Sequence, residues 1–268
     1  MSGPVLLVGC GKMGGAMLDG WLARSMLAAG AHLIEPNAAS VAAFRGRPGV
    51  TCHDRISDLH AGLKPEIVVL AVKPQMMDAV LPDLARFSAA TFLSIAAGKR
   101  IAGLSTTLGG AAVVRSMPNT PAAVGRGMTV AVAGPGVTTT ARQRCDELLS
   151  AVGEVAWVDD ERLIDPVTAV SGGGPAYVFL LIETLAAAGE KAGLPADLAM
   201  RLARVTVSGS GELAHLSSEP AAQLRQNVTS PGGTTLEALK VLMADDGIQP
   251  IFDRAIAAAT KRAGELGK

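Results

Sequence analysis

A glycine-rich turn near the start of the chain has the spacing of a dinucleotide-binding site. In the pattern G-x-G-x-x-G the first glycine permits a tight turn, the second lets the backbone approach a pyrophosphate, and the third lets a helix pack closely on a strand. The apolar run Val5–Val8 precedes the turn, and an amphipathic helical pattern follows it. We therefore predict a phosphate-binding helix N-terminus, built from Gly9, Gly11, Lys12, Met13 and Gly14.

An acidic residue, Glu35, ends the second predicted strand about 20 residues after the last of these glycines. A carboxylate at that position accepts hydrogen bonds from a ribose 2′-hydroxyl and repels a 2′-phosphate. We therefore expect Glu35 and Asn37 to contact the cofactor, which is NADPH or NADH, with Glu35 favouring NADH. Arg45, Arg47 and Arg55 lie nearby in the sequence and would favour NADPH if they folded over the same site.

A second glycine-rich turn, in the later part of the chain, is suited to binding a carboxylate. Its glycines would leave backbone N–H groups free, and the neighbouring hydroxyls add donors. Thr234 and Glu237 also have the spacing of a capping box, so an ordinary helix start is the alternative interpretation. The candidate donors are Ser230, Gly233, Thr234 and Thr235.

Three consecutive glycines between Ser171 and Pro175 predict a further helix start. Proline is favoured at the first helical position, and the glycines before it would expose backbone amides. Ser171 is therefore a candidate for contacting an anionic substrate. The alternative is that these glycines permit two helices to cross closely.

Two other turns follow predicted strands and should face one crevice. In an open α/β sheet, ligands bind outside the carboxyl ends of the strands. Both turns are therefore expected near the nicotinamide end of the cofactor. They comprise Ala71, Val72, Lys73 and Pro74 after one strand, and Met117, Pro118 and Asn119 after another.

No general acid or base emerges from the ionisable residues. The histidines lie in unrelated segments without a carboxylate at a useful spacing: His32, His53, His60 and His215. We predict solvated or structural roles for them, and no metal site. Chemistry that needs little proton transfer by side chains favours reduction of an electrophilic C=N bond over oxidation of an alcohol.

The elements that must position these turns alternate between strands and helices as far as residue 158. Continuous apolar runs are typical of strands buried on both faces of a mostly parallel sheet. After about Asp159 the apolar residues recur at helical spacing. We predict an α/β fold, with a Rossmann-type doubly wound sheet in residues 1–160 and an all-α substrate-binding and dimerisation domain in residues 161–268. The predicted strands are Val5–Val8, His32–Ile34, Ile67–Val72, Thr91–Ile95, Ala112–Val114, Met128–Val132 and Glu154–Val158.

Composition restricts the partners of this chain. With 24 basic and 24 acidic side chains among 268 residues, its formal net charge is zero, so a nucleic-acid partner is not expected. We expect no basic leader and no stretch approaching the roughly 18 apolar residues of a membrane span. Three cysteines without a CxxC spacing fit a reducing compartment. These features predict a cytoplasmic protein with a small-molecule substrate, and the apolar later helices predict a homodimer.

Taken together, these motifs resemble those of pyrroline-5-carboxylate reductase, in the same order over nearly the whole chain. The resemblance implies reduction of 1-pyrroline-5-carboxylate to L-proline, the last step of proline biosynthesis. It also implies a helical domain that interlocks two protomers, with dimers assembling into decamers. The motifs are Gly9–Gly14, Ala71–Pro74, Ser94–Gly98, Met117–Pro121, Ser171–Tyr177 and Ser230–Thr235.

The resemblance assigns roles to residues by position. It implies that Ser230, Gly233 and Thr234 bind the substrate carboxylate together with Thr235, which would lie near the ring nitrogen as the catalytic residue. The imine would enter as, or become, an iminium ion, with a hydroxyl or water assisting the nitrogen. Ala96 joins the cofactor-binding residues on the same ground.

Two other functions fit part of the sequence. A 3-hydroxyacid dehydrogenase of the 6-phosphogluconate dehydrogenase type also joins a Rossmann domain to helices and resembles Val170–Gly173. Its chemistry needs a lysine base shortly after that segment, whereas Lys191 is the first lysine downstream. A dinucleotide-binding redox sensor without turnover is the other alternative, because the first motif alone indicates binding and not catalysis.

Overall fold

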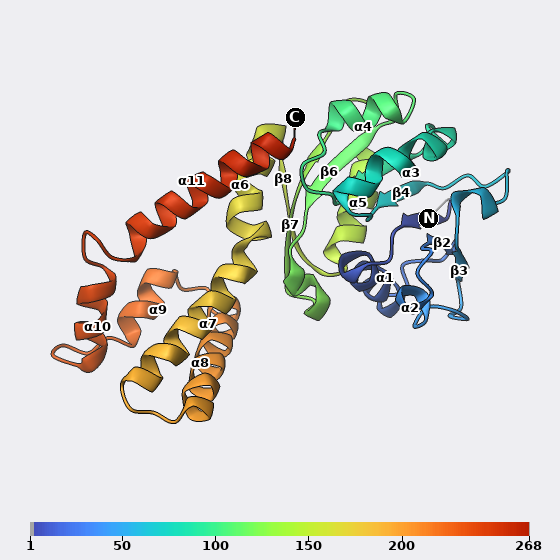
Figure 1. Ribbon diagram of the computed structural model, residues 1–268. Coiled ribbons are helices and arrows are strands. Elements are labelled where there is room, and N and C mark those ends of the chain that lie inside the picture. Colours follow the sequence, from blue (N-terminus) through green and yellow to red (C-terminus); the bar gives the residue numbers. More distant parts are fainter. Residues whose placement is uncertain (1–2, 268) are drawn as a thin grey trace. The chain divides into compact units, whose positions relative to one another are not determined.

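The computed structural model describes residues 3–267, in which an eight-stranded sheet is followed by helices (Figure 1). The strand order is β3-β2-β1-β4-β5-β6-β7-β8. Every neighbouring pair is parallel except β6 and β7, which are antiparallel. The strands are β1 Val5–Val8, β2 Ala31–Ile34, β3 Val50–His53, β4 Ile67–Leu70, β5 Thr91–Ser94, β6 Val113–Met117, β7 Gly127–Ala133 and β8 Gly153–Val158.

Helices cover both faces of this sheet because alternate strand residues point to opposite sides. Leu7 belongs to one apolar core, with Trp21 and Leu148, and Leu6 belongs to the other, with Met77. The indole Nε1 of Trp21 donates a hydrogen bond of 2.8 Å to the Leu148 carbonyl and so joins two helices on one face. Each fully buried side chain of this size stabilises the fold by about 1.5 to 3 kcal/mol. The doubly wound α/β class is confirmed.

Helices connect the strands and then make up the remainder of the described chain. Those of the first part are α1 Lys12–Ala23, α2 Ala38–Val41, α3 Met77–Leu84, α4 Ile101–Thr107, α5 Thr139–Ser150 and α6 Ile164–Val167. Those that follow are α7 Gly174–Lys191, α8 Ala196–Leu216, α9 Ala221–Asn227, α10 Thr234–Leu242 and α11 Ile248–Leu266. No strand follows β8 in the part of the chain that the structure describes, which agrees with the predicted all-α region.

One strand was not predicted from the sequence. β3, at the edge of the sheet, contains the polar residues Thr51 and His53, and its residues are exposed or only partly buried. An edge strand has a neighbour on one side only, so the continuous apolar signal of the inner strands is missing there. Pairing with β2, in the register His32 with Thr51, decides its structure.

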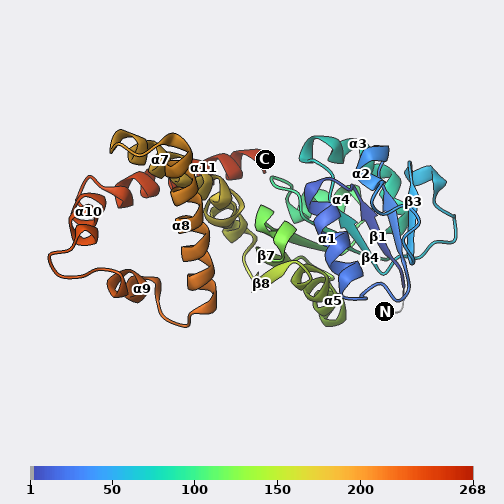
Figure 2. The same cartoon turned by 90° about the horizontal axis from the view of Figure 1, so that it is seen from below.

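The chain divides into two compact units. One contains the sheet, ends at Gly172 and also takes in the chain from Ala259 onward; the other is Gly173–Ala258. In the second unit α7 packs against α8, and both appear in Figure 2. A Cβ on Gly189 of α7 would lie 3.3 Å from the Cβ of Ala199 of α8, so small residues allow the close approach.

The second unit exposes many large apolar side chains. Phe179 on α7 is 59% exposed and Val205 on α8 is 64% exposed. The helical run Glu161–Lys191 is long and apolar enough, by length and composition, to cross a membrane, although such a helix is weak evidence for a span. The expectation that no stretch comes near this composition is therefore wrong for this run.

Candidate functional site

The glycine-rich turn between β1 and α1 has the geometry that its sequence predicts. Gly9 has a φ of 98°, and a Cβ there would lie 2.8 Å from backbone atoms of Ala71, which directly follows β4. A Cβ on Gly14 would collide with the Gly9 carbonyl oxygen. At Gly11, by contrast, no described atom lies within 4 Å of an added Cβ. The turn is tight where strand and helix meet, and open where a phosphate would approach.

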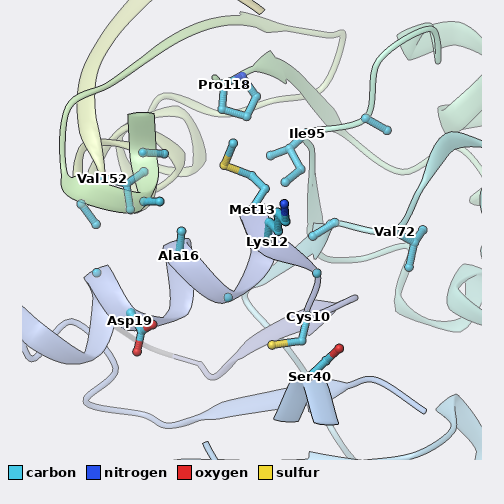
Figure 3. A pocket seen from close by; sticks show the side chains of 18 of the residues that line it. Cys10, Lys12, Met13, Ala16, Asp19, Ser40, Val72, Ile95, Pro118 and Val152 are labelled. Carbon is cyan, nitrogen blue, oxygen red and sulfur yellow. The ribbon is translucent and has the colours of Figure 1, made fainter. Parts of the chain in front are cut away.

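The N-terminus of α1 opens onto a cavity of about 1160 Å³ (Figure 3). Gly11 is the N-cap of α1, and no side chain caps the first turn. The free amides and the positive end of the helix dipole therefore point at the space where an anion fits. In Figure 3, Met13, Ile95 and Pro118 surround one end of the cavity, and Asp19 lies further along α1.

The cavity brings together many of the residues predicted to bind the cofactor. Its lining includes Gly11, Lys12, Met13, Ala71, Val72, Lys73, Pro74, Ala96 and Pro118. The predicted residues outside its lining are Gly9, Gly14, Glu35, Asn37, Met117 and Asn119.

Sequence reasoning missed other residues that line the cavity. Ala16, Gly20 and Ala23 form a strip of small residues along α1, and Phe44 and Val152 come from other segments. The strip has helical spacing, which was a usable signal for a closely approached helix face. At Gly20 a Cβ would lie 2.9 Å from the Val152 side chain, so that position lets Val152 pack on α1. Phe44 and Val152 carry no such pattern, since only the fold brings them to the cavity.

The Glu35 side chain turns toward the glycine turn. One carboxylate oxygen accepts a hydrogen bond of 2.8 Å from the Cys10 amide, and the other accepts one of 3.0 Å from the Asn37 amide. Asn37 in turn caps α2, through its Oδ1 and the Ala39 amide at 3.0 Å. Burial, and next the Glu35 charge, raise the pKa of the Cys10 thiol to about 11, so it stays protonated near neutral pH. Glu35 therefore joins the end of β2 to the phosphate turn.

Two of the arginines that were expected to compete at this position have partners for their guanidinium groups, whereas Arg55 is bound through its backbone amide. Arg45 pairs with Asp54 at 3.5 Å, and Arg47 donates to the Ala43 carbonyl at 3.3 Å. The Arg55 amide donates to Asp58 at 3.0 Å. Both members of the Arg45 pair are more than half exposed, so this pair is weak and the guanidinium is free to move.

Asn119 uses its side-chain amide within the protein. Its Nδ2 lies 3.3 Å from the Ser171 carbonyl and 3.2 Å from the Ser171 hydroxyl, and its Oδ1 accepts a hydrogen bond of 2.9 Å from the Met128 amide. The adjacent Met117 contacts Gly172, where an added Cβ would lie 2.7 Å from the Met117 methyl. The turn that follows β6 is thus joined to the glycine-rich segment at Ser171.

The segment Ser171–Tyr177 contains the predicted helix start, because α7 begins at Gly174 with Gly173 as its N-cap and Pro175 in its first turn, but this start is not a free helix end. A π-helical turn, Thr168–Gly172, leads directly into α7, and the helical run continues from Glu161 to Lys191. Pro175 lies in the first turn of α7, but the turns before it are already helical. The extra residue of the π-turn is accommodated by contacts with the sheet, which local sequence rules do not anticipate.

The turn before α10 is a helix start without the predicted capping box. Gly233 is the N-cap, no side chain caps the helix, and Glu237 pairs with Lys240 at 2.7 Å. Gly232 has a φ of 73°, and the Gly233 amide bonds to the Ser230 carbonyl at 3.0 Å. A capping box from Thr234 to Glu237 requires Thr234 to be the N-cap, whereas here Thr234 is the first helical residue. The uncapped first turn places backbone amides and threonine hydroxyls at one helix end.

Two of the histidines for which solvated or structural roles were predicted, His32 and His53, come together in the fold. They stack from neighbouring strands β2 and β3, with His32 Nδ1 3.0 Å from His53 Nε2. Burial, with a smaller contribution from His53, lowers the pKa of His32 below its ordinary value of 6.5. The pair is a structural contact at the sheet edge, apart from the residues that line the cavity.

Two family profiles match this chain. One, described as pyrroline-5-carboxylate reductase dimerisation, matches residues 161–266. The other, described as NADP oxidoreductase coenzyme F420-dependent, matches residues 4–98. The first covers the helices with the exposed apolar side chains, and the second covers the glycine turn and β1 to β5.

Individual relatives resemble the chain over its whole length. The pyrroline-5-carboxylate reductase of Pseudomonas aeruginosa is 39% identical and covers 100% of this chain and 98% of its own. The solved pyrroline-5-carboxylate reductase of Coxiella burnetii is 32% identical with a TM-score of 0.91, covering 100% of both chains. The pyrroline carboxylate reductase of Plasmodium falciparum, solved with NADP bound, is 28% identical with a TM-score of 0.81, covering 100% and 99%.

Proposed function

This chain belongs to the pyrroline-5-carboxylate reductase family, and from that premise we propose how its residues reduce their substrate. The protein is an NAD(P)H-dependent oxidoreductase that converts 1-pyrroline-5-carboxylate to L-proline. The full-length similarity to curated reductases carries this conclusion, because it includes both the glycine turn and the helical region. A hydroxyacid dehydrogenase or a redox sensor has no comparable support.

The cavity at α1 suits the dinucleotide. Gly11 has no neighbour where a side chain would stand, and the uncapped amides of α1 are suited to a pyrophosphate. We assign the phosphates to Gly11, Lys12 and Met13, and the nicotinamide half to the turns at Ala71–Pro74 and Pro118, with Ala96 between them. When bound, the reduced nicotinamide supplies the hydride.

The turn before α10 is proposed to hold the substrate carboxylate. Ser230, Thr234 and Thr235 offer hydroxyl groups around an uncapped helix end whose N-cap is Gly233. At Gly232 no described atom lies within 4 Å of an added Cβ, so the approach to the backbone is open there. A helix N-terminus favours a negative charge by its dipole as well as by its free amides. This anchoring would orient the ring and thus present the C=N carbon for reduction.

Thr235 is proposed to act at the ring nitrogen. Hydride addition to carbon leaves an electron pair on nitrogen, which is neutral if the imine was protonated first. If the imine enters unprotonated, the nitrogen must also gain a proton, which a water held by the Thr235 hydroxyl can donate and solvent then replaces. The step therefore needs a proton donor and no base. Ser171 is proposed as a further substrate contact, presented from the π-turn.

The two regions of the chain have different proposed roles, and the second region also forms the homodimer. The chain is a homodimer through the region that matches the dimerisation family. We propose that residues 1–160 hold the cofactor and residues 161–268 hold the substrate and the second protomer, with dimers assembling further into a pentamer of dimers. The exposed apolar run then serves the dimer contact in a cytoplasmic protein that does not use a membrane.

A steady-state assay tests the proposed function. The full-length protein is incubated with 1-pyrroline-5-carboxylate and NADH or NADPH while nicotinamide absorbance is followed and L-proline is measured. We expect cofactor oxidation and proline formation in equal amounts. Binding of cofactor without turnover would support the redox-sensor alternative, and turnover only with 3-hydroxyacids and oxidised cofactor would support the dehydrogenase.

A further inference from the structure

Three alternate residues from β6 and the turn after it hold one helical segment. Arg115, only 3% exposed at its side chain, pairs through Nη1 with Glu161 at 3.0 Å and through Nη2 with Asp165 at 3.6 Å. Further along, Met117 packs on Gly172, and Asn119 hydrogen-bonds to Ser171. The segment from residue 161 to 172 therefore lies along the end of β6.

The hydrogen bonds of Asn119 explain why it does not line the cavity. Both hydrogens of its Nδ2 have oxygens of Ser171 within reach, and its Oδ1 is bound by the Met128 amide. A side-chain amide has two donors, and both have protein acceptors here. The neighbouring Pro118, in contrast, does line the cavity. The turn after β6 thus presents Pro118 to the cavity that suits the cofactor, and it presents Asn119 to Ser171.

The segment that Asn119 holds is intrinsically irregular. Ser171 lies in the π-turn Thr168–Gly172, a conformation that is rare and often occurs at functional sites. A π-turn depends on outside contacts more than a regular helix does. Asn119 supplies such a contact to the carbonyl and the hydroxyl of Ser171 together, and thereby sets the position of that hydroxyl.

We propose that Asn119 is a positioning residue that holds the Ser171 π-turn, and not a ligand of the cofactor. It acts on the substrate through Ser171, while the same turn contacts the cofactor through Pro118. This assignment rests on the proposed role of Ser171 as a substrate contact. Arg115 and Met117 keep the rest of the segment in place, so loss of the amide contact should displace Ser171 without unfolding the unit.

The test uses the full-length enzyme with Asn119→Asp, which retains an acceptor for the Met128 amide and loses both donated hydrogen bonds. We expect KM for 1-pyrroline-5-carboxylate to rise about tenfold while the Kd for NADPH and NADH changes by less than about twofold. A double-mutant cycle combines Asn119→Ala with Ser171→Ala. The fold-loss of kcat/KM in the double variant should be smaller than the product of the fold-losses in the two single variants, because both substitutions act through the Ser171 hydroxyl.

Hydrogen exchange provides a readout that does not depend on activity. Asn119→Asp should speed amide exchange in residues 168–174 and leave residues 9–15 unchanged. Thr138→Ala, which removes the N-cap of α5, is a control for general destabilisation and should alter neither KM nor that exchange. A weaker cofactor Kd in Asn119→Asp, additive single losses, or unchanged exchange would overturn the proposal. Absence of turnover by the wild-type protein would instead count against the proposed function.

Discussion

The hydroxyl of Thr235 is the single group on which the proposed chemistry depends most. It stands in the uncapped first turn of α10, where an anion is favoured by the helix end. We predict that Thr235→Ala lowers kcat/KM roughly tenfold or more, because a hydrogen bond to a charged group is worth about 1.5 to 3 kcal/mol. Steady-state kinetics measure this loss, and Thr235→Ser should restore most of it. An alanine variant with unaltered kcat/KM would remove Thr235 from the site.

Glu35 decides between the two cofactors in our second prediction. Its carboxylate lies against the amides of Cys10 and Asn37, and a 2′-phosphate brought to the same place would be repelled. Glu35→Ser should therefore shift the ratio of kcat/KM toward NADPH, by about 1 to 3 kcal/mol. Glu35→Gln is the matched control, because it removes the charge and keeps an acceptor for the Cys10 amide. If neither variant alters the ratio, Glu35 serves only to hold the turn.

At the scale of single elements, the edge pair β2 and β3 should respond to acid. The pKa of His32 is lowered in the fold, so the unfolded chain binds more protons as the pH falls below about 6.5. The contribution of neutral His32 to stability is thus fully present above that value and is lost as the pH falls through the folded pKa. We predict that His32→Gln has a smaller loss of unfolding free energy between pH 8 and pH 5 than the wild type.

Urea titrations at both pH values measure this difference. His60→Gln is a suitable control, because His60 is exposed and its ring accepts a hydrogen bond from the nearby Gly62 amide. If the free energy of unfolding depended equally on pH in the wild type and in His32→Gln, protonation of His32 would not contribute to the loss of stability in acid.

At the scale of the whole molecule, the apolar faces of α7 and α8 require a second protomer. Phe179 is 59% exposed in the isolated chain, and burying such a side chain is worth about 1.5 to 3 kcal/mol. We predict that Phe179→Glu converts dimers to monomers and abolishes activity, as measured by light scattering and by the reductase assay. Met76→Glu, which replaces a side chain 54% exposed on the sheet unit, should leave the oligomer intact. An active Phe179→Glu monomer would contradict the dimer requirement.

Local sequence determined the parts of the fold that depend on neighbours along the chain. The positive φ of Gly9 and the close packing at Gly14 follow from glycine spacing after an apolar strand. The buried strands β1 and β4 follow from continuous apolar runs, and the change to helices after β8 follows from a change of period. The order of the motifs, together with their residue types, was sufficient to predict the family and the reaction.

Tertiary structure alone decided what depends on residues far apart in the sequence. The sequence places Glu35 after β2, but only the paired strands bring its carboxylate to the Cys10 amide. The contact of Asn119 with Ser171 and the stacking of His32 on His53 likewise join distant segments. Glycine and proline predicted the start of α7, but the π-turn through Ser171 that precedes it is held by contacts with β6 and the turn after it. Propensity and spacing describe neighbours along the chain, whereas these features are stabilised by packing across it.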